Sequence, residues 1–273
     1  MSGTSAAFSH EGAKVTVEAT RLSPWWKALP VWAKQEFVLL LREPVAVFFS
    51  LAFPLVIYVF IGIPYGLREV VPGVRFIDMM FPALIVTVIA NLLIMGLPIY
   101  LSELRTRGVD RRYAILPLPG WILGAAILIA MLGLVVGGAA VITGVVAVVN
   151  GLRPSWISSA LPLLLAGSVV WLSALGFLIG SLRVSSRTTQ ALSAVIFFVM
   201  FFGSGAAVPL EGLPETLQSI LDWNPLKQWL DVMVGVYTGM DVTPDEWLKL
   251  WMALPLTVVA SGLALSLWTR RAS

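Results

Sequence analysis

The chain has 273 residues, of which 58% are hydrophobic and only 12% are charged, with a formal net charge of +3. Soluble domains carry about a quarter charged residues, so these charges are too few to cover a water-facing surface, and the composition predicts an integral membrane protein. Cysteine is absent and the single histidine, His10, lies in a polar N-terminal stretch, which excludes disulfides and thiolate chemistry and argues against His-based metal sites.

The N-terminal residues 1–24 lack the apolar core of a signal peptide, and we expect a cytoplasmic tail there. The next segment, 25–43, predicts an amphipathic helix that lies on the cytoplasmic membrane surface. Its apolar side holds Trp32, Phe37, Leu40 and Leu41, against Lys34, Gln35 and Arg42. A Trp-rich flank of the first membrane span is the alternative.

Six apolar runs are long enough to cross about 30 Å of hydrocarbon as helices, which takes about 20 residues. They are residues 45–63, 79–101, 121–149, 156–180, 188–208 and 248–268. Backbone groups inside lipid must be paired within the segment, so continuous runs of this length predict helices. The third run exceeds the hydrocarbon thickness at about 1.5 Å per residue and should tilt or protrude. We therefore expect one all-α membrane domain over residues 25–273.

The basic residues are distributed asymmetrically between the two sides of this arrangement. Most of the 18 Lys and Arg residues lie in segments 1–44, 102–119, 181–187 and the C-terminal tail. The positive-inside rule therefore places both termini in the cytoplasm. No basic run stands beside an aromatic platform, so we expect no nucleic-acid partner.

Residues 209–240, between the fifth and sixth runs, are predicted to form an outer hairpin. Pro214 and the pair Asn224-Pro225 can each start a helix, and apolar residues recur at helical spacing after the second start. Helices of about 9–13 residues suit re-entrant or interfacial placement better than a full crossing. An ordinary solvated loop remains the alternative.

The apolar runs contain almost no ionisable residue, which argues against an ion-coupled transporter or a proton pump. The sequence has no GxxxxGK[ST] loop, and an intramembrane enzyme would lack groups for general acid–base chemistry. Uphill transport would then need a partner that hydrolyses ATP and binds the cytoplasmic face.

Three stretches carry a family resemblance: "EFVLLLREPVAVFFSLAFPLVIYVFIG", "SELRTRGVDRRYAILPLPG" and "GSGAAVPLEGLPETLQSILDWNPLKQWLDVMVG". They resemble, in order, the amphipathic helix with the first span, the loop between spans two and three, and the end of span five with the outer hairpin of type-2 ABC exporter permeases. The Gly108-to-Pro117 spacing matches the family pattern. Leu104 and Val109-Asp110 depart from it, with Glu103 beside the position of the family's acid.

The resemblance implies a homodimer or heterodimer of permeases with two copies of a separate ATPase subunit, which would bind ATP and Mg. This chain would then be no enzyme and would bind no cofactor. The ATPase-docking residues implied are Glu36, Arg42, Glu43, Arg105, Arg107, Gly108, Asp110, Arg111, Arg112 and Tyr113. Simple positive-inside anchoring is the alternative for the arginines.

The substrate path is expected at the seam between two permease copies, with the outer hairpin as its lid. Candidate path residues are Phe81, Leu84, Asn91, Met95, Phe197, Phe198, Met200, Phe201 and Phe202. Candidate lid residues are Pro209, Pro214, Asn224, Pro225, Leu226 and Trp229. A Met- and Phe-rich stripe suits varied hydrophobic cargo, although internal packing is the commoner use.

We thus expect an ABC exporter permease in the inner (cytoplasmic) membrane of a bacterium, in contact with membrane lipid. The expected substrate is a drug, an antibiotic or a lipid-like amphiphile, taken from the cytoplasm or the inner leaflet. Export of a polysaccharide or a lipid-linked glycan is one alternative. A membrane scaffold or sensor subunit that transports nothing is another.

Overall fold

The computed structural model describes residues 25–42, 44–109, 121–154, 160–206 and 213–269. The predicted docking residues Glu43, Asp110, Arg111, Arg112 and Tyr113 and the predicted lid residue Pro209 lie outside these ranges.

The described residues form helices joined by short loops, with one small β-hairpin. The N-terminal half holds α1 (Trp25–Leu41), α2 (Pro44–Ile57), the π-helix η1 (Tyr58–Gly62), α3 (Ile63–Tyr65), α4 (Phe76–Ala90), the π-helix η2 (Asn91–Gly96) and α5 (Leu97–Thr106). The C-terminal half holds α7 (Trp121–Val149), α8 (Leu161–Ser181), α9 (Ser186–Phe202), α10 (Glu215–Leu221), α11 (Pro225–Thr238) and α12 (Pro244–Thr269). Strands β1 (Glu69–Val71) and β2 (Val74–Arg75) pair antiparallel through a turn in which Gly73 has a φ of 77°.

Four helical stretches among the described residues are long and apolar enough to cross a membrane. They are Phe76–Thr106, Trp121–Val149, Leu161–Ser181 and Pro244–Ala264. Two shorter apolar helices, Leu51–Tyr65 and Ser186–Phe202, lie where the first and fifth spans are predicted. The prediction of a helical, multi-pass membrane protein is confirmed, while the count of six spans and the cytoplasmic position of the termini stay predictions.

Several predicted boundaries differ from the structure. The helix of the second span continues through η2 and α5 to Thr106, so the first charges of the predicted loop 102–120 are helical. The fifth helix ends at Phe202 instead of residue 208, because residues 203–205 form a turn in which Gly205 has a φ of 79°. The sixth begins earlier, at Pro244, which can take the first helical position because it needs no backbone donor there.

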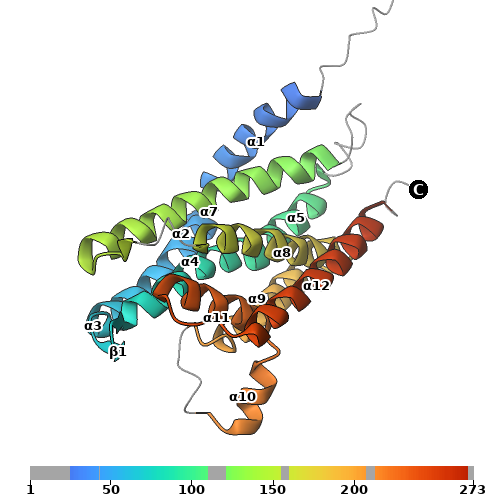
Figure 1. Cartoon of the computed structure of the whole chain (residues 1–273). Coiled ribbons are helices and arrows are strands. Elements are labelled where there is room, and N and C mark those ends of the chain that lie inside the picture. Colours follow the sequence, from blue (N-terminus) through green and yellow to red (C-terminus); the bar gives the residue numbers. More distant parts are fainter. Residues whose placement is uncertain (1–24, 43, 110–120, 155–159, 207–212, 270–273) are drawn as a thin grey trace, which may run out of the picture.

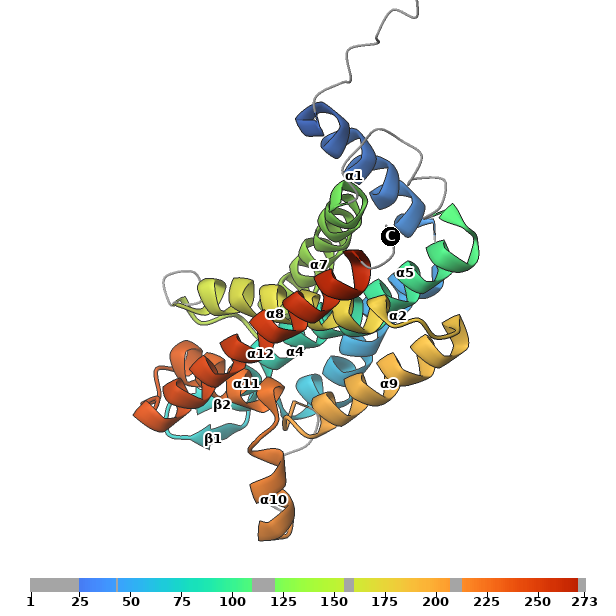
Figure 2. The ribbon, with the colours of Figure 1, turned by 90° about the vertical axis from the view of Figure 1, so that its right-hand side faces the viewer.

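The continuous stretch from α4 to α5 forms the centre of the molecule and is the most buried of the apolar helices. Helix α1 lies beside α7 at one end of the bundle, and the β-hairpin, α10 and α11 lie at the opposite end (Figure 1, Figure 2). By the predicted topology the first end is cytoplasmic and the second is outer. Within Pro244–Ala264 of α12, most of the described side chains are exposed or half-buried.

Small residues allow the helices around α4 and η2 to approach closely. A Cβ atom on Gly176 of α8 would lie 2.1 Å from the backbone oxygen of Leu93 in η2. A Cβ atom on Gly138 of α7 would lie 2.7 Å from Cγ1 of Val88 in α4. Contacts this short leave no room for a side chain, so glycine is what permits the approach of α7 and α8 to the central helix.

Candidate functional site

The predicted cytoplasmic end of the bundle presents basic side chains from several elements. Arg42 follows α1 and is exposed, and Arg107 follows α5 and is also exposed. Arg107 pairs with Glu103 through Nη2 and Oε2 at 3.2 Å, and Gly108, with a φ of 66°, follows the end of α5. Ion pairs this exposed contribute little stability, so both arginines are available for a partner protein.

Arg105, which the resemblance places among the docking residues, instead binds its own chain. Its Nη1 donates to the backbone oxygen of Leu182, at the end of α8, over 2.6 Å. Thr106 and Ser186 form a 2.8 Å hydrogen bond beside it. A cation at a helix C-terminus satisfies free carbonyl groups, so these contacts fix the end of α5 to the turn between α8 and α9.

This arrangement brings Arg183 and Arg187 next to the end of α5. Both are exposed; Arg183 lies in the turn between α8 and α9, and Arg187 lies in the first turn of α9. In the sequence, this turn contributes only to the predicted orientation, because the spacing of residues 105 and 182 does not show that they meet. The candidate docking surface of the described residues therefore comprises Arg42, Arg107, Arg183 and Arg187.

Glu36, the other described docking candidate, is buried on the face of α1 that meets the bundle. Its side chain is only 4% exposed, and its Oε2 accepts a hydrogen bond from the hydroxyl of Tyr100 on α5. Burial raises the pKa of Glu36 above its usual value, and the Tyr100 hydrogen bond offsets part of that rise. A side chain in this position joins α1 to α5 and cannot at the same time contact a partner subunit.

Helical spacing could have shown the placement of Glu36. Ala33, Glu36 and Leu40 are three and four residues apart, so they share one face of α1, and all three are buried. Lys34, Gln35 and Arg42 are exposed, as predicted, but Leu41 is exposed too. Phe37 packs on Gly133 of α7, where an added Cβ atom would lie 2.8 Å from the ring. The apolar face of α1 thus covers α7.

The predicted path residues of α9 divide between the core and the surface. Phe197 and Phe201 are buried and stack with ring centroids 5.6 Å apart, and Met200 is buried with them. Phe198 and Phe202 are 42% and 51% exposed and stack on each other at 6.0 Å.

Phe53 of α2 completes this group of rings. Its ring lies edge-on to Phe201 at 5.3 Å and to Phe198 at 6.3 Å. We call Phe53, Phe198 and Phe202 the aromatic face. Its rings connect α2 to α9, and the side chains of Phe198 and Phe202 are exposed at the surface of the bundle.

The predicted path residues of the second span do not belong to the aromatic face. Phe81, Leu84 and Asn91 are buried inside the bundle, and Phe81 packs on Tyr237 of α11 with ring centroids 5.3 Å apart. Asn91 begins η2, so the half-buried Met95 does not continue an α-helical stripe from it. The structure therefore does not gather these residues and the aromatic face into one surface.

The two helices of the predicted outer hairpin differ in environment. Asn224 caps α11 by accepting from the Leu226 amide at 3.0 Å, and its Nδ2 donates to the Met200 oxygen at 2.7 Å. Leu226 and Trp229 are buried, with Trp229 stacked on Trp171 of α8 at 6.4 Å. Pro225 occupies the first turn of α11, while Pro214 precedes α10 and is exposed. The two helices lie where predicted, and their depth relative to the membrane stays a prediction.

Asp78, Arg75 and Arg153 form a group at the outer end that the sequence analysis missed. Asp78 is 2% exposed and pairs with Arg75 through Oδ1 at 2.9 Å and with Arg153 through Oδ2 at 3.2 Å. Arg75 and Asp78 are three residues apart at the start of a span, which is a readable signal. Arg153 comes from a loop distant in sequence, and no local pattern predicts that it contacts Asp78.

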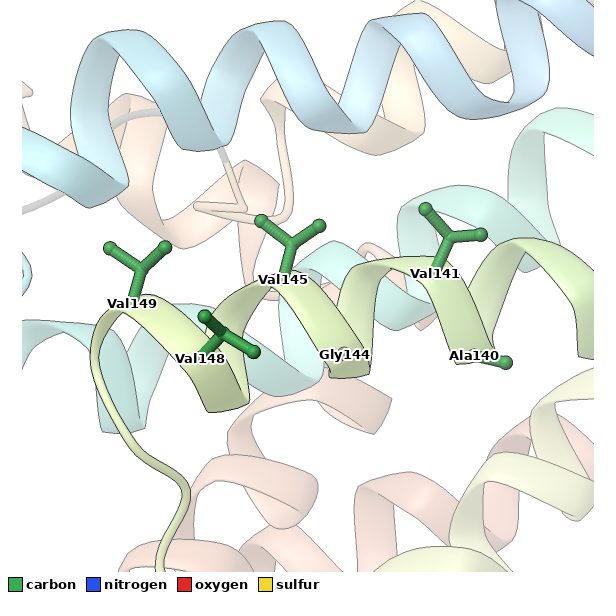
Figure 3. Close-up of a pocket in the computed structure, with 6 residues that line it drawn as sticks. All are labelled: Ala140, Val141, Gly144, Val145, Val148 and Val149. Atoms are coloured by element: carbon green, nitrogen blue, oxygen red, sulfur yellow. The ribbon is translucent and has the colours of Figure 1, made fainter.

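An open apolar groove of about 490 Å³ runs along the outer half of α7 (Figure 3). It is lined by Ala140, Val141, Gly144, Val145, Val148 and Val149. It offers no polar group for a cofactor and contains none of the predicted path residues. Within the described ranges, no three acidic or His side chains lie close enough together to hold a metal ion.

Comparison with known families agrees with this architecture. The sequence model of the ABC-2 type transporter family matches residues 28–238, which run from α1 to the end of α11. No curated protein matches the chain.

Proposed function

Since the chain belongs to the ABC-2 type transporter family, we infer that it is the permease subunit of an exporter of hydrophobic or amphipathic molecules. Family membership makes it the membrane component of an ABC transporter, which works with an ATPase subunit. We propose two ATPase copies on the cytoplasmic face and a second permease copy beside this one. The substrate class proposed is a drug, an antibiotic or a lipid-like amphiphile.

The aromatic face is the observation that supports this substrate class. Phe198 and Phe202 leave about half of each side chain uncovered, and Val195 and Val199 of the same helix are exposed beside them. Aromatic and aliphatic side chains bind apolar molecules through contact area without fixed hydrogen-bond geometry. A second copy placed against this face would enclose an apolar path between the two α9 helices.

The exposed arginines at the other end support the proposed docking of the ATPase. Arg42 and Arg107 follow α1 and α5, Arg183 lies in the turn between α8 and α9, and Arg187 lies in the first turn of α9. The Arg105–Leu182 hydrogen bond holds the end of α5 to that turn. An ATPase bound there would push on α5, α8 and α9 as one body. Basic groups on an interface rim speed and orient docking and add little affinity each.

Stimulated ATP hydrolysis tests the proposal. The chain would be purified with its ATPase partner in lipid nanodiscs, and hydrolysis would be measured with a panel of cationic amphiphiles, phospholipids and lipid-linked glycans. We expect amphiphiles to stimulate hydrolysis and the change Phe198→Ala to reduce that stimulation. Stimulation by glycans alone would contradict the substrate class. A chain that binds no ATPase would contradict the transporter proposal and favour a scaffold.

A further inference from the structure

Asp78 and its two arginines tie together four parts of the outer end. The guanidinium group of Arg75 donates to the oxygens of Asn150 at 2.7 Å and Gly151 at 3.1 Å, at the end of α7. Arg153 donates through Nη1 to the Thr238 oxygen at the end of α11 over 2.7 Å, and through Nη2 to the Gly73 oxygen in the β-hairpin. Asp78 itself lies in the first turn of α4. We call Arg75, Asp78 and Arg153 the Asp78 cluster.

The groups of the Asp78 cluster bind one another and the backbone of the chain. Each guanidinium nitrogen of Arg75 and Arg153 lies close to an oxygen of Asp78 or of the backbone, and the Nε of Arg153 meets Asp78 as an ion pair without hydrogen-bond geometry. The cluster therefore fastens elements to one another. The cluster holds one negative and two positive charges, so removing the Asp78 carboxylate leaves two guanidinium groups without their shared counter-ion.

Helix α11 is held at both ends. At its C-terminal end, Arg153 binds the Thr238 oxygen, and the Arg153 amide donates to the Tyr237 hydroxyl at 3.3 Å. Near its N-terminal end, Trp229 fills the space over Gly167 of α8, where an added Cβ atom would lie 2.5 Å from the ring. These contacts make α11 part of the bundle.

Helix α10 is less covered than α11, and its contacts with other elements lie near its C-terminal end, where Leu221 approaches Gly203 and the Asp222 oxygen accepts from Gln228 at 3.1 Å. None of its residues is buried, and Leu217, Ile220 and the following Trp223 are 41%, 63% and 73% exposed. Figure 1 and Figure 2 both show it projecting away from the other helices. The hydrogen bonds of Gln218 to the Leu213 oxygen and of Ser219 to the Glu215 oxygen stay within its own segment.

We propose that the outer hairpin has two mechanically distinct parts: α11, a fixed wall fastened by the Asp78 cluster, and α10, which moves about Asn224. The fastening is a property of the chain alone. The role of the hairpin as an outer gate rests on the proposed function. In that role only α10 moves, so we propose α10 alone as the lid, in place of both helices.

Hydrogen–deuterium exchange of the full chain in lipid nanodiscs tests the fastening without an ATPase. We expect backbone amides 215–221 to exchange fast and amides 228–238 to be protected. The change Asp78→Asn should speed exchange at 235–239, 150–153 and 69–75 together by about 10-fold or more, and leave α10 unchanged. The control Lys227→Gln removes ion pairs to Asp222 and Asp231 on the same hairpin and should not change exchange at 235–239.

Two outcomes would overturn the proposal: wild-type α11 that exchanges as fast as α10, or Asp78→Asn that leaves residues 235–239 protected. If Asp78→Asn does not fold, Arg153→Lys keeps the charge but cannot reach the Thr238 and Gly73 oxygens together, and the same shift is expected.

Exchange in the ATPase complex, with and without ATP and vanadate, tests the use as a gate. Nucleotide should change exchange in α10 and not in α11, and the reverse result would contradict the division of the hairpin. If the amides of α11 are protected from exchange as described but the complex exports no substrate, the proposed function is contradicted and the division of the hairpin is not.

Discussion

Tyr100 on α5 donates a hydrogen bond to the buried carboxylate of Glu36 on α1, so the helix that precedes the first span is joined to the second span by a polar contact. Helix α1 is therefore held between this contact and the packing of Phe37 on Gly133. Any force that the ATPase applies to α1 would reach α5 through Glu36.

The change Glu36→Gln should remove a pH dependence of stability. Burial raises the pKa of Glu36 in the folded chain, so between the ordinary value of 4.5 and the raised value the folded state holds a proton that the unfolded state has lost. The free energy of unfolding should then fall as the pH rises through that window. Gln does not titrate, so the variant should lack this slope and be at least as stable as wild type at pH 7.5. Melting temperatures in detergent from pH 4.5 to 8 measure the effect; parallel curves for the two proteins would contradict it.

The change Tyr100→Phe should destabilise the chain at pH 7.5, because the buried carboxylate loses its donor. The loss should be about 1–3 kcal/mol, which is typical of a buried polar group left without a partner. Thermal unfolding of the purified chain measures it. The double variant with Glu36→Gln serves as the control, and it should recover part of the loss because the uncompensated charge is gone.

Arg105 and Arg107 should behave differently although they are two residues apart. Arg107→Ala should lower ATPase co-purification by up to about five-fold with membrane levels unchanged, because an exposed ionic contact is worth about 0–1 kcal/mol. Arg105→Ala should lower the melting temperature instead, since it removes the 2.6 Å hydrogen bond to the Leu182 oxygen. Equal ATPase binding by wild type and Arg107→Ala would argue against docking through this residue.

Single cysteines can test the proposed second permease copy and locate its seam, since the chain has no cysteine of its own. Phe198→Cys and Phe202→Cys should form disulfide-linked dimers on mild oxidation in membranes, because the aromatic face is proposed to lie at the seam. Val258→Cys on α12, where the native side chain is 71% exposed, is the control and should stay monomeric. Non-reducing electrophoresis reports the result, and preferential cross-linking at residue 258 would place the seam elsewhere.

Gly176→Ala and Gly137→Ala form a matched pair for helix packing. The first should cost about 1–3 kcal/mol, because its Cβ atom would meet the Leu93 oxygen of η2 at 2.1 Å and the helices must separate. The second has nothing within 4 Å of the added atom and should be neutral or slightly stabilising, since alanine favours helix. Melting temperatures distinguish them, and equal values would contradict the close approach of α8 to η2.

The sequence predicts what depends on local pattern. Long apolar runs predict the helices of the spans, and the third run, 121–149, matches α7 residue for residue. Prolines 214 and 225 mark the starts of the two outer helices, because proline at a helix start needs no backbone donor.

What the sequence does not predict depends on residues that meet from afar. Asp78 meets Arg153, and Arg105 meets Leu182, 77 residues away, only after the helices pack. Glu36 is a different case: the resemblance implies a docking role, while the helical period places the side chain on the buried face of α1. The split of Phe197 from Phe198 likewise follows from which side of α9 packs against α5 and η2, and composition does not predict it.

The π-helix η2 is the place where the second span can change in length by one residue. A π-helical turn accommodates one residue more than an α-helical turn, so deletion of one residue within Asn91–Gly96 would restore continuous α-helix. The helix after the deletion would keep about its present rotation, and Tyr100 would still face Glu36. The same deletion within α4 would instead rotate everything after it by about 100° and shift it by about 1.5 Å, which would turn Tyr100 away from Glu36 and Arg105 from Leu182. The extra residue in the middle of the span is thus taken up locally, and the part of the helix that follows keeps its register with its neighbours.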